Sequence, residues 1–240
     1  MKRENCVEVS LVTNSRNLYA ATGFLAAALA FVPPVGVTAA LGSGEESVSS
    51  EAERLKNWPN LLGPSASVAS ATRLLLKWDG ETGEGIKWKT RIPLPGYSSP
   101  IYWNGKLYLT GGNASTRMVY CIDAQSGEII WERQVKNIPG SSGRVGVGED
   151  TGYAASTMAT DGIRVFASFA NGDLAAFDLE GSPVWSKNLG KPENMYGHAS
   201  SLVSHGDDLL IQYDQENLGY VAALDVATGE ERWKTERDFG

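Results

Sequence analysis

The stretch AAFDLEGSPVWSKNL, residues Ala175–Leu189, decides the fold because the chain repeats it on both sides. One copy is CIDAQSGEIIWERQV (Cys121–Val135), and another is ALDVATGEERWKTER (Ala223–Arg237). Each copy has an apolar lead-in to an aspartate, a turn closed by glycine, and a further stretch that carries a tryptophan. A looser copy, WDGETGEGIKWKT, contains Trp88. The chain is therefore built on an internal repeat.

The spacing of the copies indicates the class of fold. The tryptophans of successive copies, Trp88, Trp131, Trp185 and Trp233, are 43, 54 and 48 residues apart. Repeats of about 40–50 residues composed of short strands are typical of β-propeller blades. The sequence therefore predicts an all-β propeller made of four-stranded blades.

The strands of each blade can be read between the tryptophans. Short apolar stretches alternate with turns such as Asn104-Gly105, which is the pattern of antiparallel hairpins. The predicted blades cover about 99–135, 155–189 and 199–236. One additional strand is predicted over Ile86–Arg91. Because propeller rings have about 4–8 blades, this ring is incomplete, and we expect residues 57–240 to be the N-terminal portion of a longer propeller.

The residues that recur in every copy have structural roles. A tryptophan on the last strand of a blade can lie flat between neighbouring sheets, where a ring of its size buries about 150–250 Å². The glycine supplies a turn position with positive φ, and the aspartate accepts hydrogen bonds from its own turn. The aspartates and glycines of the three full copies are Asp123, Asp178, Asp225, Gly127, Gly181 and Gly229.

The composition is that of an ordinary globular chain, with 42% hydrophobic and 20% charged residues. The formal net charge is −7, and lysines and arginines form no run in the sequence. A nucleic-acid surface would require a clustered basic face. We therefore expect no nucleic-acid partner.

The first forty residues have the features of an export signal. Basic residues precede an apolar stretch over residues 18–32, and two prolines follow it. This stretch is shorter than the ~20 residues that span a bilayer, and small residues at 37–39 suit a signal peptidase. We predict a cleaved signal peptide over residues 1–40, with an uncleaved membrane-anchor helix as the alternative, and a flexible linker over 41–56. Export would place the protein in the periplasm or cell envelope, with membrane contact only through this segment.

The repeat resembles that of a known family. The phrase A-x-D-x-x-T/S-G-x-x-x-W is similar to the repeat of pyrroloquinoline-quinone-like (PQQ-like) β-propellers, over about residues 75–240. NWP at 57–59 and GP at 63–64 also resemble the start of exported bacterial propellers of this type, although Leu61-Leu62 replaces their aromatic–arginine pair. The family includes quinoprotein alcohol dehydrogenases and the non-catalytic scaffold of outer-membrane barrel assembly. The shared fold does not choose between them.

The resemblance implies a test for the catalytic branch. Those dehydrogenases stack the quinone on a disulfide between adjacent cysteines and hold Ca²⁺ with acidic and amide side chains. The two cysteines here, Cys6 and Cys121, are far apart in the sequence. Acidic pairs such as Glu149-Asp150 lie in turns, whereas Ca²⁺ needs six to eight gathered oxygens. We therefore predict no catalytic, metal or cofactor residues; the alternative is a quinoprotein oxidoreductase that binds PQQ and calcium in blades not present here.

The longest repeat contains a glycine-rich insertion that runs from Gly140 to Tyr153. It lacks the strand–helix context and the Lys-Ser/Thr of a phosphate-binding loop. Because loops carry function more often than blade cores do, this insertion is the candidate recognition surface, with Arg144, Glu149, Asp150 and Tyr153 as its candidate residues. The sequence thus predicts an exported, non-catalytic module that binds or scaffolds envelope proteins.

Overall fold

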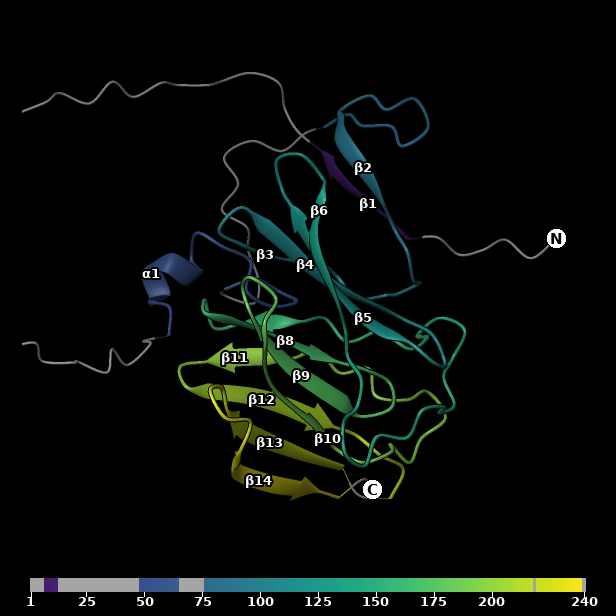
Figure 1. The fold of residues 1–240 in the computed structure, drawn as a ribbon, viewed down its shortest axis with the longest axis vertical. Coiled ribbons are helices and arrows are strands. Elements are labelled where there is room, and N and C mark those ends of the chain that lie inside the picture. Colours follow the sequence, from purple (N-terminus) through teal and green to yellow (C-terminus); the bar gives the residue numbers. More distant parts are fainter. Residues whose placement is uncertain (1–6, 13–47, 65–75, 218, 239–240) are drawn as a thin grey trace, which may run out of the picture.

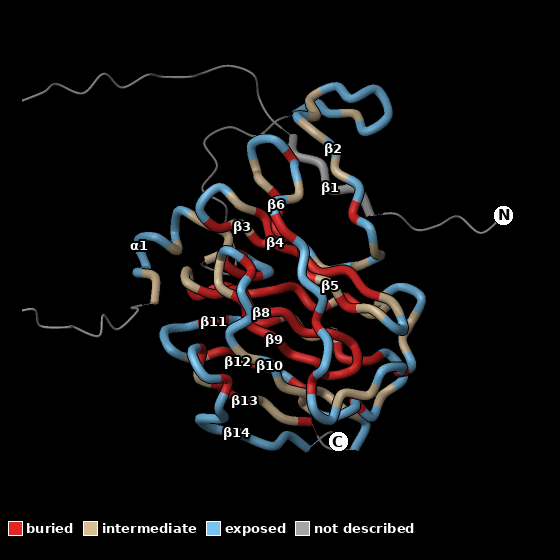
Figure 2. Tube along the Cα trace, viewed as in Figure 1, coloured by how far each residue is buried: buried red, intermediate tan, exposed pale blue. Residues whose placement is uncertain are grey.

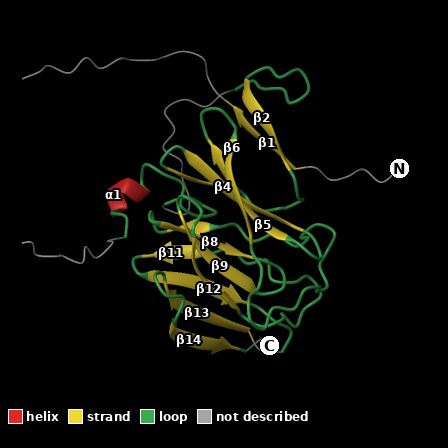
Figure 3. Cartoon of the chain, in the orientation of Figure 1, coloured by secondary structure: helices red, strands yellow, loops and turns green. Residues whose placement is uncertain are grey.

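The computed structural model describes residues 7–12, 48–64, 76–217 and 219–238, and these are almost entirely β-structure (Figure 3). The helix in the described part, α1 (Glu51–Arg54), is a single turn. The described strands form three four-stranded antiparallel sheets and one two-stranded sheet. The all-β fold of four-stranded blades in an incomplete ring is therefore confirmed.

Each four-stranded sheet is one blade, and its strands are consecutive in the sequence. Blade 1 contains β3 (Ile101–Trp103), β4 (Lys106–Gly112), β5 (Arg117–Asp123) and β6 (Ile129–Gln134). Blade 2 contains β7 (Ala159–Thr160), β8 (Arg164–Ser168), β9 (Asp173–Asp178) and β10 (Pro183–Asn188). Blade 3 contains β11 (Val203–His205), β12 (Asp208–Tyr213), β13 (Gly219–Asp225) and β14 (Glu231–Arg237). Figure 1 shows the blades side by side, with β14 at one end.

The two-stranded sheet lies at the other end, beyond blade 1 (Figure 1). It pairs β1 (Val7–Val12) with β2 (Ile86–Ile92), the additional strand predicted from the sequence. The sequence placed residues 1–40 outside the fold, but the alternating pattern VEVSLV favours a strand, and β1 pairs with the edge of β2. The apolar stretch predicted as a signal or anchor helix lies outside the described residues. In the part of the chain that is described, no helix is long and apolar enough to cross a membrane.

Residues 48–64 contact the first strand of each of the three blades, β3, β7 and β11. Trp58 forms an isolated β-bridge with β3, and the Pro59 carbonyl accepts a hydrogen bond of 2.9 Å from an amide of β7. The Arg54 guanidinium donates to the Ser204 carbonyl of β11 at 2.9 Å. One segment from outside the blades therefore contacts each of them.

These contacts correct the linker prediction. The sequence predicted flexibility over residues 41–56, whereas the structure shows residues 48–56 fixed against the blades. α1 begins with a capping box, in which Ser50 and Glu53 each bond the other's backbone amide. The serine and glutamate interpreted as linker residues instead begin a helical turn.

The last two strands of each blade are joined by the same turn, which we call the docking turn. In blade 1 the Asp123 carboxylate accepts hydrogen bonds from the Gln125 amide at 2.8 Å and the Ser126 amide at 2.7 Å. These bonds hold the pKa of Asp123 below its ordinary value. The docking turns are Asp123–Gly127, Asp178–Gly181 and Asp225–Gly229, and a fourth, Asp79–Gly83, precedes β2.

The hydrophobic core lies between the sheets, where the tube in Figure 2 is red. A tryptophan on the last strand of one sheet covers the docking-turn glycine of the next sheet. A Cβ atom built on Gly181 would lie 2.8 Å from the Trp131 ring, so only glycine allows this approach. The contact recurs at three joints, Trp88 over Gly127, Trp131 over Gly181 and Trp185 over Gly229. Each joint is thus a repeated unit of packing.

Candidate functional site

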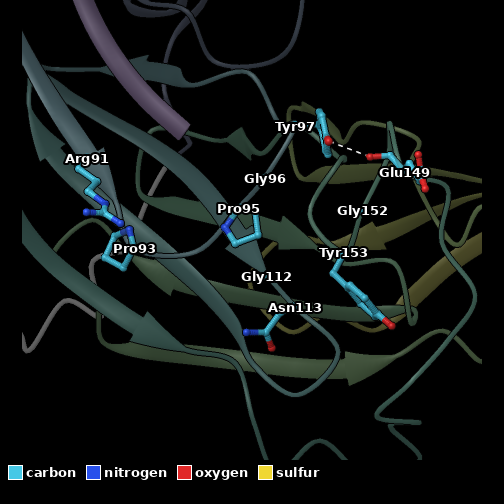
Figure 4. A pocket seen from close by; sticks show the side chains of 10 residues that line it. All are labelled: Arg91, Pro93, Pro95, Gly96, Tyr97, Gly112, Asn113, Glu149, Gly152 and Tyr153. Atoms are coloured by element: carbon cyan, nitrogen blue, oxygen red, sulfur yellow. Dashed lines mark hydrogen bonds between the residues drawn. The ribbon is translucent and has the colours of Figure 1, made fainter. Parts of the chain in front are cut away.

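A cavity of about 510 Å³ opens beside blade 1, between the segment that joins β2 to β3 and the glycine-rich insertion. Figure 4 shows its walls. The lining residues are Arg91, Pro93, Pro95, Gly96, Tyr97, Gly112, Asn113, Glu149, Gly152 and Tyr153. Its size is within the range of about 300–1,000 Å³ that ligand pockets have.

The first wall is the segment Pro93–Tyr97, which lies directly on β4. The Gly112 amide donates to the Pro95 carbonyl at 2.7 Å. A Cβ atom on Gly96 would lie 2.5 Å from the Thr110 carbonyl oxygen, so glycine allows the two backbones to touch. Because Pro93 and Pro95 have φ fixed by their rings just before Gly96, the wall is stiff before any ligand arrives.

The second wall is the end of the insertion. The Tyr97 hydroxyl donates to the Glu149 carbonyl at 2.7 Å, as the dashed line in Figure 4 shows. The Tyr97 amide donates to the Ala154 carbonyl at 2.8 Å. Tyr153 faces the cavity from the same loop, and its hydroxyl donates to the Val145 carbonyl at 3.0 Å. These bonds join the two walls and set the width of the groove.

The base of the insertion is held by a buried carboxylate. Asp173 of β9 forms an ion pair with Arg117 of β5, with 2.9 Å between the Arg117 Nε and Asp173 Oδ2 atoms. The Ser141 hydroxyl donates to the same oxygen at 2.9 Å. The side-chain amide of Asn171 donates to the Ser142 carbonyl at 2.8 Å. Because both charged groups are buried, this network joins blade 1, blade 2 and the insertion at one point.

The structure separates the four candidate recognition residues. Glu149 and Tyr153 line the groove. Arg144 and Asp150 are exposed on the insertion and are not among the residues that line it. The prediction of a recognition surface in this insertion remains untested, and the groove identifies which half of the insertion it concerns.

The residues of the other wall are not among the candidate recognition residues predicted from the sequence. Pro93, Pro95 and Asn113 reach the groove only because β2, β4 and the insertion meet there. The signal present in the sequence was the unusual run IPLPGY at residues 92–97, where two prolines and a glycine interrupt a strand pattern. Tyr97 is 49% exposed despite its two hydrogen bonds.

The groove has the chemistry of a polypeptide-binding surface. Two tyrosine rings and two prolines supply apolar area, while Arg91 and the Glu149 carboxylate supply opposite charges at its rim. Tyrosine gives large contact area at a low entropic cost, and this makes it common in protein-binding surfaces. An extended peptide in this cavity would contact aromatic rings, backbone polar groups and charged side chains.

A quinone seat of the kind that the PQQ-like resemblance implies does not fit the described residues. Cys121 is completely buried in the joint between blades 1 and 2, against Tyr108 and Trp131. Burial raises the pKa of its thiol to about 11. Across the described ranges, no three side chains of His, Cys, Asp or Glu gather as metal ligands. Cys121 is a free, buried thiol and therefore does not form the stacking disulfide that the resemblance implies.

Comparison with known proteins identifies the family. The model of the family described as outer membrane protein assembly factor BamB matches residues 52–239. The chain belongs to this family. Its PQQ-like propeller repeat, predicted from the recurring phrase, is thereby confirmed.

Solved structures with a similar fold include members of both branches. BamB from Moraxella catarrhalis is 21% identical, with a TM-score of 0.45 over 62% of this chain and 42% of that one. A europium-containing methanol dehydrogenase is 20% identical, with a TM-score of 0.45 over 60% of this chain and 25% of that one. Quinohemoprotein alcohol dehydrogenase from Comamonas testosteroni is 21% identical, with a TM-score of 0.44 over 60% and 21%. The chain thus spans less than half of each, and no curated protein matches it.

Proposed function

We propose that this chain is an exported, non-catalytic propeller module that binds a protein of the cell envelope through the groove beside Tyr97. The family to which it belongs is described as an outer membrane assembly factor, which supports a role in protein assembly. On this proposal, residues 1–40 direct export, and the partner is a protein rather than a nucleic acid or a small substrate.

The observation that carries the proposal is the construction of the groove. The hydrogen bond from Tyr97 to the Glu149 carbonyl joins its stiff first wall, Pro93–Tyr97, to its second wall, the end of the insertion. A preformed groove loses little entropy when a ligand binds. Exposed tyrosine rings provide the anchors on which protein interfaces depend. A protein segment is the ligand that uses all of these features.

A photo-crosslinking amino acid at position 97 in living cells tests this function. We expect position 97 to form an adduct with an envelope protein. The matched control is position 78, because Trp78 is also an exposed aromatic residue, at 63%, and lies outside the groove. Equal labelling at the two positions, or labelling at neither, would contradict the proposal.

Affinity measurements with the captured partner then test the groove itself. We expect Tyr97→Ala to raise the Kd about tenfold or more, because it removes an anchoring ring. Tyr97→Phe keeps the ring and removes only the hydroxyl that bonds the Glu149 carbonyl, so it separates contact area from groove geometry. Trp78→Ala should leave the Kd unchanged. A Kd that none of these substitutions alters would show that the partner binds elsewhere.

A further inference from the structure

Exposed apolar side chains occur beyond the groove, on the connection between β10 and β11. Met195 and Tyr196 of this connection are 65% and 55% exposed, and Tyr97 in the groove wall is 49% exposed. Large apolar side chains that gather on one surface mark an interaction site. Neither Met195 nor Tyr196 lines the groove, so they are additional to the site already described.

The glycine-rich insertion lies between the two tyrosines and contacts both of them. The Thr151 hydroxyl donates to the Tyr196 carbonyl at 3.3 Å. A Cβ atom built on Gly148 would lie 3.4 Å from the Tyr196 ring, and one built on Gly152 would lie 3.3 Å from the Tyr97 ring. Because glycine has no side chain, the two rings remain exposed beside the loop that they contact.

The turn between β8 and β9 holds both connections in place. The Ala170 amide donates to the Tyr153 carbonyl at 3.1 Å, and the His198 amide donates to the Ala170 carbonyl at 2.9 Å. The insertion joins blades 1 and 2, and the connection that carries Tyr196 joins blades 2 and 3. Each connection therefore has a described blade on both sides, and backbone contacts with blade 2 fix the two tyrosines relative to each other. A preformed surface of this kind loses little entropy when a ligand binds.

The charged groups between the two tyrosines are carboxylates. Glu149 and Asp150 are both exposed, and residues 145–155 contain no lysine or arginine. Residues 192–199, around the second tyrosine, contain Glu193 and likewise no lysine or arginine. Such a surface attracts basic side chains and repels phosphate groups. Its ligand is therefore expected to carry positive charge together with apolar groups for the rings.

We propose that the partner segment bound in the groove is extended and basic, and that it crosses the insertion to contact Tyr97 on one side and Met195 with Tyr196 on the other. This inference rests on the proposed function and adds the chemistry and the path of the bound segment. The two rings anchor apolar side chains of the segment, and lysine or arginine between those side chains pairs with Glu149 and Asp150. Because an extended chain rises about 3.3 Å per residue, a short segment can reach both rings.

A photo-crosslinking amino acid at position 196 in living cells tests the path of the segment. We expect position 196 to capture the same envelope protein as position 97. The matched control is position 130, because Ile130 is exposed to a similar degree, at 47%, and lies on β6 outside both connections. Capture at position 97 without capture of that protein at position 196 would overturn this inference and leave the proposed function standing. Capture at neither position would contradict both.

Charge reversal on the insertion tests the chemistry of the segment. We expect Asp150→Lys to raise the Kd for the captured partner about tenfold at low salt, since it places a cation against basic side chains, and we expect the difference to shrink in about 0.5 M salt. The matched control is Arg144→Glu, an equally large change of charge at the exposed cation that precedes these carboxylates, and it should not raise the Kd. A Kd that Asp150→Lys lowers or leaves unchanged would show that the bound segment is not basic.

Alanine substitution tests the second anchor. Tyr196→Ala should raise the Kd for the captured partner about tenfold, because it removes an anchoring ring, whereas Ile130→Ala should leave the Kd unchanged. Thermal unfolding of each variant verifies that the fold is retained. If Tyr97→Ala weakened binding and Tyr196→Ala did not, the partner would be confined to the groove and the inference would be overturned.

Discussion

Trp131 and Trp233 occupy the same position of the same repeat, yet one is buried and the other is exposed. Trp131 lies between blades 1 and 2 over Gly181, and its indole donates to the Leu179 carbonyl at 3.1 Å. Trp233 has the same strand neighbours but no described blade beyond it. The difference shows that a repeat tryptophan is buried by the neighbouring blade rather than by its own, so each joint is formed by two repeats.

The largest effect is expected from removing the two tryptophans in turn. Trp131→Ala should lower the free energy of unfolding by about 4 kcal/mol, because it leaves a cavity in a closed joint. Trp233→Ala should lower it by less than about 1 kcal/mol, since nearly half of that side chain is already exposed. Urea unfolding at concentrations where the chain is monomeric measures both. Similar losses for the two variants would show that the comparison is wrong.

A pH titration extends the comparison to a buried contact of blade 3, the stacking of His198 on Tyr213 at the end of β12. His198 is completely buried against Tyr213, with ring centroids 4.8 Å apart. Burial lowers the pKa of His198 to about 4, and Asp214 partly opposes this. Since the folded state favours neutral imidazole, its stabilisation is present above the unfolded pKa of about 6.5. It is lost as the pH falls toward 4, by up to about 3 kcal/mol.

His198→Phe is the matched variant for this titration, because it keeps a ring on Tyr213 and removes the titrating group. The stability of this variant should depend less on pH between 6.5 and 4, as measured by urea unfolding at each pH. If both proteins lost the same free energy over this range, His198 would not be the source of the pH dependence.

The smallest difference is expected between two glycines, Gly181 in a closed joint and Gly83 in an open turn. Alanine costs about 1 kcal/mol at either Gly181 or Gly83, because φ is +87° and +81°. Only at Gly181 would the new Cβ atom lie 2.8 Å from the Trp131 ring, which adds about 2 kcal/mol of overpacking. Thermal or urea unfolding of Gly181→Ala and Gly83→Ala measures the difference. Equal destabilisation would mean that the ring moves aside without cost.

Much of the fold could be predicted from the sequence because each repeat is a local pattern. The Asp–Gly turn and the tryptophan lie within eight residues of each other, so one stretch such as Asp123–Trp131 shows both. That residues 48–56 are held against the blades could not be predicted in this way. Ser50–Arg54 is mostly polar in sequence, and its position against the blades depends on distant contacts such as the bond from Arg54 to the Ser204 carbonyl, 150 residues later.

Of the residues that line the groove, only Glu149 and Tyr153 were among those predicted from the sequence, for the same reason. Glu149 and Tyr153 belong to a loop whose length made it visible in the sequence. Tyr97 and Pro95 belong to a short connection, and they line the groove because β4 and the insertion fold onto them. Distant segments form a site through contacts that no local pattern records.

The sequence by itself determined the repeat, its strands and turns, and the residues that can form a joint, because propeller blades are local units. Only the tertiary structure decided which joints are closed. It also decided that Cys121 lies inside a joint, that Pro93–Tyr97 becomes a groove wall, and that β2 and β14 lie at opposite ends of the row of sheets. Burial depends on which surfaces meet, and that is a property of the folded chain rather than of any single repeat.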